Sequence, residues 1–220
     1  AGNLAHSLRT PLAIITDEAE RRYHSQDTAA AGHLPLAVFR PHSVAALAQG
    51  VALATNAGTD TGCIGDLVAG ATVVEASGEV REWTAEQFAY RYRHSNLCAS
   101  RATVVAARLA LRPAPPEEVR AKIARLREKR ASRQPLGAWS AGSVFKNPRG
   151  VAAGKVLDRA GAKGMRVGDA QVATKHANFL VNRGHATAAE MRELIARVHA
   201  LALRRYEIDL ELEIELVGEW

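Results

Sequence analysis

The sequence predicts an α+β fold, and three patterns along the chain support this prediction. The stretch 209–217 alternates between acidic and aliphatic side chains, the period-two pattern of a half-buried strand. Residues 188–206 repeat apolar side chains at the spacing of an amphipathic helix. Residues 71–83 contain two short runs on either side of a Ser-Gly turn, which predicts a β-hairpin. We therefore expect helices and paired strands within residues 60–220.

In the N-terminal half of the chain, helical spacing and turn residues predict two helices, then mostly strands. Residues 1–21 have apolar side chains at helical spacing, and Pro11 is expected to kink or divide that helix. A second helix is expected over 43–55, with Ser43 as its N-cap. After the hairpin, Thr84 and Gln87 form a capping box, which predicts a helix start. The β-branched run 103–112 predicts a strand.

In the C-terminal half, the expected elements are two long helices and two strands. The first helix covers 116–132, and its many basic side chains are interleaved with glutamates, which is typical of a solvated face. The apolar run 178–182 predicts a short buried strand. Thr187 and Glu190 form the capping box of the helix over 188–206. The chain then enters the alternating strand described above.

Composition restricts the classes of protein that the chain can belong to. It has 220 residues, a net charge of +6, 47% hydrophobic residues and only 5% aromatic residues, which predicts a globular protein with an aliphatic core. The positive charge favours anionic ligands such as phosphorylated small molecules. The sequence has no basic stripe with interleaved aromatic residues, the pattern that would indicate nucleic-acid binding. Cys63 and Cys98 form no metal or disulfide spacing, so a reducing, cytoplasmic environment is expected. No apolar run reaches the ~18 residues of a membrane span.

The stretch SAGSVFKNP, residues 140–148, concentrates polar side chains in a stiff loop. Ser143 follows Gly142, and Lys146 and Asn147 stand before Pro148, which pushes the preceding residue into an extended conformation. A serine in such a turn often only satisfies nearby backbone groups. As a general acid it suits a very basic acceptor, such as a carbanion or an enolate. Both interpretations stay open from the residues alone.

Three further groups of residues are candidates for ligand contacts. Arg93, within the stretch YRYRHS, could bind a carboxylate through two parallel hydrogen bonds, or it could be an exposed arginine after a helix. Arg130 and Arg133 at the end of the basic helix could reach a diphosphate or be solvated. His176 is a structural residue or a ligand. No spacing of histidine and acidic residues predicts a metal site.

Taken together, these stretches resemble one enzyme family. Six stretches occur in the order found in the UDP-N-acetylenolpyruvoylglucosamine reductase (MurB) family: NAG (56–58), YRHS (92–95), RASRQPL (130–136), SAGSVFKNP, KHANFLVN (175–182) and the terminal LELEIELVG. The resemblance covers about residues 56–220. It implies an oxidoreductase, a UDP-N-acetylmuramate dehydrogenase, that uses FAD and NADPH to reduce the enolpyruvyl ether of a UDP-sugar in peptidoglycan synthesis, hence in cell wall formation.

The resemblance also implies a role for individual residues. Arg93 and Glu213 would face the substrate carboxylate, and Ser143 would donate the proton that completes the reduction. The cofactor-binding residues would be Asn56, Gly58 and Arg130. The substrate-binding residues would be Tyr92, Arg133, Lys146 and Asn147. No metal is implied, and we expect a monomer that binds neither nucleic acid nor membrane.

The chain departs from the family pattern before residue 56. The family has a Gly-Gly-Gly-Ser-Asn phosphate loop there, and this sequence has none. The expected fold is therefore a MurB-like substrate-binding domain with a truncated FAD-binding portion of the PCMH type. The expected divisions are 1–58 (an N-terminal helical segment and a remnant of the FAD-binding domain), 59–112 (central strands) and 113–220 (the C-terminal domain). Because glycine-rich loops let the backbone approach a pyrophosphate, impaired flavin use is expected, and a UDP-sugar-binding fragment without catalytic activity is the alternative.

Two weaker resemblances concern the N-terminal residues. Residues 35–58 resemble the first strand–helix unit of FAD-linked oxidase domains. Residues 3–20 resemble the phospho-acceptor helix of sensor histidine kinases, with His6 at the phosphorylated position. This leaves a signalling fragment as a third hypothesis. Because the partner helix and the ATP-binding domain are missing from the sequence, we expect a helix without kinase function.

Overall fold

The computed structural model describes residues 36–39, 50–59 and 61–216, which fall into two compact units that divide after Val119. Each unit has a hydrophobic core of its own. Both cores are mainly aliphatic, as the composition predicts, with Phe88 in the first and Phe145 in the second. Among the helices of the described residues, none is long and apolar enough to cross a membrane.

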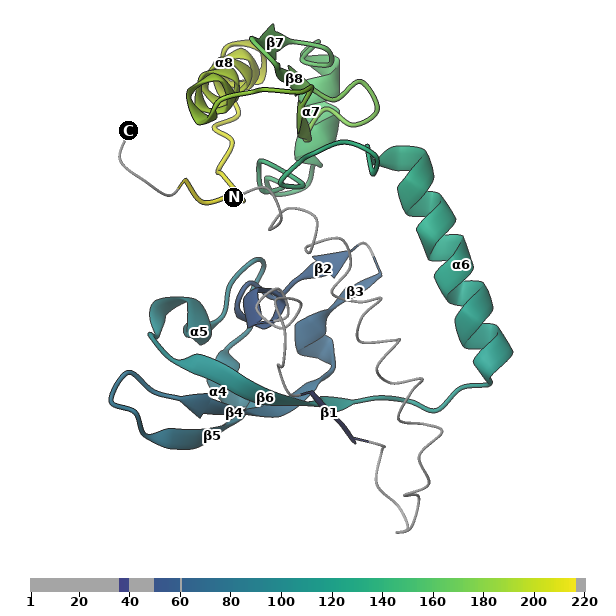
Figure 1. Ribbon diagram of the computed structural model, residues 1–220, viewed down its shortest axis with the longest axis vertical. Coiled ribbons are helices and arrows are strands. Elements are labelled where there is room, and N and C mark those ends of the chain that lie inside the picture. Colours follow the sequence, from purple (N-terminus) through teal and green to yellow (C-terminus); the bar gives the residue numbers. More distant parts are fainter. Residues whose placement is uncertain (1–35, 40–49, 60, 217–220) are drawn as a thin grey trace. The chain divides into compact units, whose positions relative to one another are not determined.

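Unit 1 contains an antiparallel sheet of four strands (Figure 1). Their order across the sheet is β1 (Leu36–Phe39), β6 (Thr103–Ala110), β4 (Val68–Val74) and β5 (Val80–Thr84). The smaller elements are β2 (Gly58–Thr59), β3 (Gly62–Cys63), the 3-10 helix η1 (Ile64–Asp66), α4 (Ala85–Phe88) and α5 (Asn96–Ala99). The predicted hairpin is confirmed: it joins β4 to β5, and Gly78 in its turn has a φ of +85°.

The core of unit 1 lies between the sheet and the short helices. It consists of Leu53, Ile64, Val68, Ala71, Val73, Phe88, Leu97, Ala107 and Leu109. Phe88 is completely buried, and its ring stacks on Tyr90 with centroids 5.1 Å apart and meets Trp83 edge-on at 5.3 Å. This aromatic group holds the stretch that follows α4 against the core.

Unit 2 combines helices with a small antiparallel sheet. The helices are α6 (Pro116–Arg133, which begins four residues before the division), α7 (Ala153–Arg159) and α8 (Ala188–Tyr206). The strands β7 (Arg166–Val167), β8 (Ala170–Val172) and β9 (Leu180–Asn182) pair in that order. α8 lies against β7, β8 and α7 (Figure 1). Its predicted capping box is confirmed, because Thr187 Oγ1 accepts the Glu190 amide at 3.2 Å.

The predicted strand over 209–217 is wrong in its extent. Of residues 209–216, which the structure describes, only Leu212 forms a bridge, with Phe145, and the flanking bonds run from Lys146 N to the Glu211 carbonyl and from Glu213 N to the Val144 carbonyl, each at 2.8 Å. The physical reason lies in the partner segment. In this antiparallel register Pro148 lies opposite Asp209 and has no amide hydrogen to continue a ladder, and at the other end Gly142, opposite Glu215, turns the segment with a φ of +94°. The alternation still places Leu210 in the core and leaves Glu211 exposed.

Other predicted elements differ in length or lie outside the described residues. The helix after Thr84 is the single turn α4, because Ala89 adopts a φ of +44° and ends it. The strand predicted over 178–182 begins at Leu180. The predicted helix over 1–21, including His6, and the first seven residues of the helix predicted over 43–55 lie outside the described residues, whereas 50–54 are helical.

Leu157 on α7 provides a test of the unit 2 core. Its side chain is completely buried, so Leu157→Ala should lower the free energy of unfolding by about 2–5 kcal/mol through lost burial and a residual cavity. The matched control is Leu203→Ala on α8, where the side chain is 43% exposed and the loss should stay below about 0.5 kcal/mol. Urea denaturation followed by circular dichroism measures both. Equal losses in the two variants would contradict this assignment of the core.

Candidate functional site

In unit 1, the residues of NAG and YRHS lie against each other. The Asn56 side chain donates from Nδ2 to the Arg91 carbonyl at 3.1 Å and accepts the Gly65 amide through Oδ1 at 3.0 Å. The Ser95 hydroxyl, completely buried, donates to the Ala54 carbonyl at 2.6 Å. Two stretches about 35 residues apart in sequence are thus joined by side-chain bonds to the backbone. The structure therefore brings together Asn56, Gly58, Tyr92 and Arg93, which were predicted from separate motifs.

Arg93 occupies a strained position in this arrangement. Arg91 and His94 exchange backbone hydrogen bonds of 3.0 and 3.2 Å, which forces Arg93 into the turn between them with a φ of +52°. Its guanidinium lies 5.2 Å from the centroid of the Tyr92 ring and donates to the Gly58 carbonyl at 3.4 Å. A non-glycine residue pays about 1–2 kcal/mol for this conformation, and such strain concentrates at functional sites.

Tyr90 is a residue that the sequence did not single out. Its hydroxyl is buried and has no hydrogen-bond partner among the described residues. Burial raises the pKa of the Tyr90 phenol above its ordinary value, so the hydroxyl keeps its proton and remains a donor. A Cβ at Gly65 would stand 2.8 Å from the Tyr90 ring, so only glycine permits this packing. The unsatisfied donor beside NAG is a feature that a ligand with acceptor atoms would complete.

In unit 2, Ser143 lies on an extended segment held from both sides. Ser143 itself bridges Phe179, and Val144 N donates to the Asn178 carbonyl at 2.9 Å. On the opposite side, the Val144 carbonyl accepts the Glu213 amide. Ser143 is partly buried, and within the described part of the chain its hydroxyl has no hydrogen-bond partner. Ser143 and Glu213 are therefore brought close in the backbone pairing, with a serine hydroxyl left able to donate.

Lys146 and Asn147, predicted to contact substrate, have partners inside the chain. The Lys146 ammonium forms an ion pair with the Glu211 carboxylate. Asn147 Oδ1 accepts the amide of Ala153, the first residue of α7, at 3.0 Å. This bond satisfies one of the free amides at the start of that helix and ties the SAGSVFKNP loop to α7. Contacts of these two residues with substrate remain predictions.

Arg130 and Arg133 lie in the last turn of α6 and are exposed. Arg130 Nε donates to Gln134 Oε1 at 3.1 Å, and Lys175 Nζ donates to the nearby Ala131 carbonyl at 2.8 Å. The second bond satisfies a carbonyl at the end of the helix. Arg93 belongs to unit 1, whereas four other predicted site residues, Arg130, Arg133, Ser143 and Glu213, belong to unit 2. That Arg93, Ser143 and Glu213 converge on one site therefore stays a prediction.

His176 has a structural position beneath this loop. Its Nδ1 accepts the Asn178 amide at 3.3 Å, and its ring meets Phe179 edge-on, with centroids 4.8 Å apart. A Cβ at Gly154 on α7 would stand 2.8 Å from the imidazole, so the ring lies directly on that helix. Burial and, to a smaller degree, the positive charge of Lys163 lower the pKa of His176, although Asp158 opposes the shift. The neutral imidazole is therefore the form that the folded state prefers.

Acidification should destabilise the fold through His176. Because its folded pKa lies below the ordinary value of 6.5, the free energy of unfolding should fall as the pH drops from 6.5 toward that lowered pKa. Urea denaturation at a series of pH values should show this decline in the wild type and a smaller one in His176→Gln. The control His185→Gln, at an exposed position, should keep the wild-type dependence. An unchanged dependence in His176→Gln would contradict the assignment.

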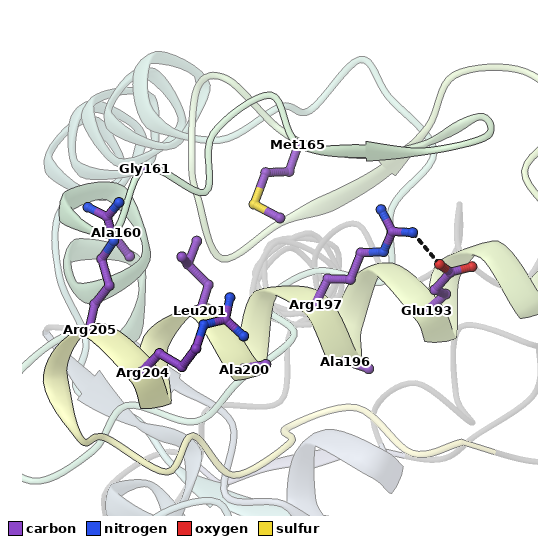
Figure 2. A pocket seen from close by; sticks show the side chains of 10 residues that line it. All are labelled: Ala160, Gly161, Met165, Glu193, Ala196, Arg197, Ala200, Leu201, Arg204 and Arg205. Atoms are coloured by element: carbon purple, nitrogen blue, oxygen red, sulfur yellow. Dashed lines mark hydrogen bonds and ion pairs between the residues drawn. The ribbon is translucent and has the colours of Figure 1, made fainter.

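An open groove of about 690 Å³ lies elsewhere in unit 2, along α8 (Figure 2). Its lining residues are Ala160, Gly161, Met165, Glu193, Ala196, Arg197, Ala200, Leu201, Arg204 and Arg205. Arg197 donates to Glu193 Oε1 at 2.5 Å, and Met165 and Leu201 contribute apolar surface. None of the predicted site residues lines this groove. Within the described part of the chain, no three histidine, cysteine or acidic side chains gather as a metal ion would require.

Comparisons with known proteins agree on one family. A model of the C-terminal domain of UDP-N-acetylenolpyruvoylglucosamine reductase matches residues 134–217. The UDP-N-acetylenolpyruvoylglucosamine reductase of Moorella thermoacetica is 49% identical over 170 residues, which are 77% of this chain and 56% of that protein. The enzyme of the same name from Agathobacter rectalis is 38% identical over 222 residues, covering 94% of this chain and 71% of that protein.

A solved structure shows the same relationship. UDP-N-acetylenolpyruvylglucosamine reductase (MurB) from Thermus caldophilus matches with a TM-score of 0.68 and 36% sequence identity, over 76% of this chain and 59% of that chain. The chain thus spans little more than half the length of the Moorella and Thermus proteins. The mixed helix and strand content expected from the sequence is confirmed by this likeness.

Proposed function

Because the chain belongs to the UDP-N-acetylenolpyruvoylglucosamine reductase (MurB) family, we propose that it takes part in the reduction of an enolpyruvyl ether on a UDP-sugar, with NADPH as the reductant and FAD as the cofactor. The product would be UDP-N-acetylmuramate, a precursor of peptidoglycan. The observation that carries the proposal is the placement of Ser143: its hydroxyl is not engaged in the described part of the chain, and its segment is held from both sides.

Arg93 would bind and neutralise the substrate carboxylate. As the enolpyruvyl group takes up a hydride at its terminal carbon, negative charge spreads onto the carboxylate. A guanidinium already held in a strained turn needs little rearrangement to stabilise that charge. Glu213 would stand on the other side of the same carboxylate and, when protonated, donate a hydrogen bond to it. The backbone bond from Glu213 to Val144 keeps this side chain near Ser143.

Ser143 would complete the reduction by giving its proton to the substrate carbon next to the carboxylate. A serine hydroxyl is a weak acid, and only a strongly basic carbon accepts its proton readily. The enolate-like state that follows hydride transfer has this basicity. Because both edges of the segment 143–146 are paired, the hydroxyl has a defined position from which general acid catalysis can proceed.

The residues beside NAG suit a flavin. The buried Tyr90 hydroxyl lacks an acceptor among the described residues, and the flavin ring carries carbonyl and nitrogen acceptors. We expect Asn56, Gly58 and Tyr90 in unit 1 and Arg130 in unit 2 to hold the cofactor. When bound, FAD supplies the hydride that it has received from NADPH. Unit 1 would thus supply most of the flavin contacts, as a truncated flavin-binding portion, and unit 2 most of the substrate contacts, while Arg93 of unit 1 would face the substrate and Arg130 of unit 2 the flavin.

A second function, UDP-sugar binding without catalysis, is supported by the glycine distribution. The chain has 17 glycines, yet no two of them are adjacent or two positions apart, so a glycine-rich phosphate loop is missing from the sequence. Such loops provide the amide groups that bind a pyrophosphate. Weaker flavin binding would leave the substrate-binding residues of unit 2 unaffected.

Purified chain mixed with FAD distinguishes the two functions. Quenching of flavin fluorescence and oxidation of NADPH that depends on the enolpyruvyl UDP-sugar would support the reductase. Calorimetric binding of the UDP-sugar without retention of flavin would support the second function. A chain that binds neither FAD nor the UDP-sugar would overturn both.

A further inference from the structure

We propose that Asn178 is a positioning residue, whose side-chain amide fixes the segment that carries Ser143. This inference rests on the proposed function, because it assigns Asn178 a role in proton donation by Ser143. Asn178 is only 2% exposed and lies 33 positions after Phe145. We call its contacts with Val144 and Phe145 the Asn178 clamp.

The Asn178 side chain bonds to both the amide and the carbonyl of Phe145, as the backbone of a neighbouring strand would. Asn178 Oδ1 accepts the Phe145 amide at 2.9 Å, and Nδ2 donates to the Phe145 carbonyl at 2.8 Å. The Asn178 carbonyl accepts the Val144 amide at 2.9 Å. The side-chain amide therefore replaces a peptide group of a neighbouring strand. It needs an acceptor and an N–H donor on two atoms held side by side, as a carboxamide provides, and glutamine, the other carboxamide, is longer by one methylene.

The clamp acts at Phe145, whose backbone groups have no other hydrogen-bond partner among the described residues. The Phe145 side chain is completely buried, so its backbone groups cannot turn to water if Asn178 is removed. On the opposite edge, residues 211–213 bond to Val144 and Lys146 and leave Phe145 to Asn178. Ser143 lies two residues before Phe145, so the register fixed at Phe145 also fixes the position of the serine.

The Asn178 clamp is itself held by the turn before it. The Asn178 amide donates to His176 Nδ1 at 3.3 Å, and the Phe179 amide donates to the His176 carbonyl at 3.0 Å. Phe179 then bridges Ser143 directly. Within the four residues 176–179, the stretch KHANF thus contains the turn at His176, the clamp of Asn178 and the bridge from Phe179 to Ser143. This explains why these residues follow one another in the sequence.

Asn178→Asp tests the proposal, because it keeps the size and the acceptor and removes the donor to the Phe145 carbonyl. The matched control is Asn182→Asp on β9, whose side chain bonds through its oxygen alone among the described residues: Oδ1 accepts the Gly184 and Ala186 amides at 2.8 and 3.0 Å. In the full chain, Asn178→Asp should slow substrate reduction by about 10²-fold, the cost of a misplaced catalytic group. Exchange of the Val144 and Phe145 amides with deuterium should be faster. Asn182→Asp should change neither.

A double-mutant cycle with Ser143→Ala separates positioning from general stability. If Asn178 acts through Ser143, Asn178→Asp should cost less than about 2-fold once the serine is absent. Equal losses in both backgrounds would overturn the proposal, as would unchanged amide exchange. Lowering the pH should restore part of the Asn178→Asp activity relative to wild type, because a protonated carboxyl can again donate.

A second variant and the activity of the wild type keep the possible outcomes distinct. Should Asn178→Asp fail to fold, Asn178→Ser, with a hydroxyl that satisfies only one of the two Phe145 groups, passes through the same cycle. If the wild-type chain reduces no substrate, the proposed function fails and this proposal falls with it. If the wild type is active and Asn178→Asp behaves as Asn182→Asp does, only the positioning role is overturned.

Discussion

Replacing Ser143 with alanine should slow reduction of the enolpyruvyl substrate by ~10²–10⁴-fold, the usual contribution of one general acid. This corresponds to about 3–5 kcal/mol on the barrier. Reduction of the flavin by NADPH should remain nearly unchanged, because that step precedes the need for a proton on the substrate carbon. Ser143→Cys should recover part of the loss, since a thiol can also deliver a proton.

Stopped-flow absorbance measures the two half-reactions separately. Because the Ser143 hydroxyl has no hydrogen-bond partner in the described part of the chain, its removal should leave the stability of the fold nearly unchanged. Ser140→Ala is a matched control, because that hydroxyl accepts the Gly142 amide at 3.1 Å and belongs to the turn alone. If Ser143→Ala slowed both half-reactions equally, the serine would be structural and its assignment as an acid would be wrong.

Elements with strong local signals could be predicted from the sequence. The capping boxes of Thr84 and Thr187 and the Ser-Gly turn of the hairpin depend on neighbours within a few residues, so they act whatever surrounds them. The long helices α6 and α8 begin and end within one residue of their expected positions. α7 and the short strands β7 and β8 were missed, because elements of two to seven residues carry too little periodicity.

The parts of the site that depend on distant pairing could not be predicted in this way. The alternation over 209–217 indicated correctly that Leu210 is buried, but the length of a strand is decided by its partner, and Pro148 and Gly142 end that partner on its two sides. The role of Asn178 depends on a residue 33 positions away, and that of Tyr90 on packing against Gly65. A buried asparagine within an apolar run, such as the one in KHANFLV, is the signal that could have identified the clamp.

Replacing Arg93 with alanine should lower kcat/KM for the enolpyruvyl substrate by about 10²–10³-fold, the range expected for loss of one preorganised charge stabiliser. Arg93→Lys should recover little, because a single ammonium does not reproduce the two parallel bonds of a guanidinium. The control Arg101→Ala removes an exposed arginine of the same unit and should leave kcat/KM unchanged. Steady-state kinetics with the UDP-sugar substrate measure all three.

The strained backbone at Arg93 gives this experiment a second readout. Arg93→Gly and Arg93→Ala both lose the guanidinium, so both should lose the same activity. Glycine adopts a φ of +52° without the penalty of about 1–2 kcal/mol that other residues pay, so Arg93→Gly should be at least as stable as Arg93→Ala. If Arg93→Gly is stable yet inactive, activity requires the guanidinium and not only the shape of the turn. An active Arg93→Gly would mean that the guanidinium is dispensable and that the carboxylate is bound elsewhere.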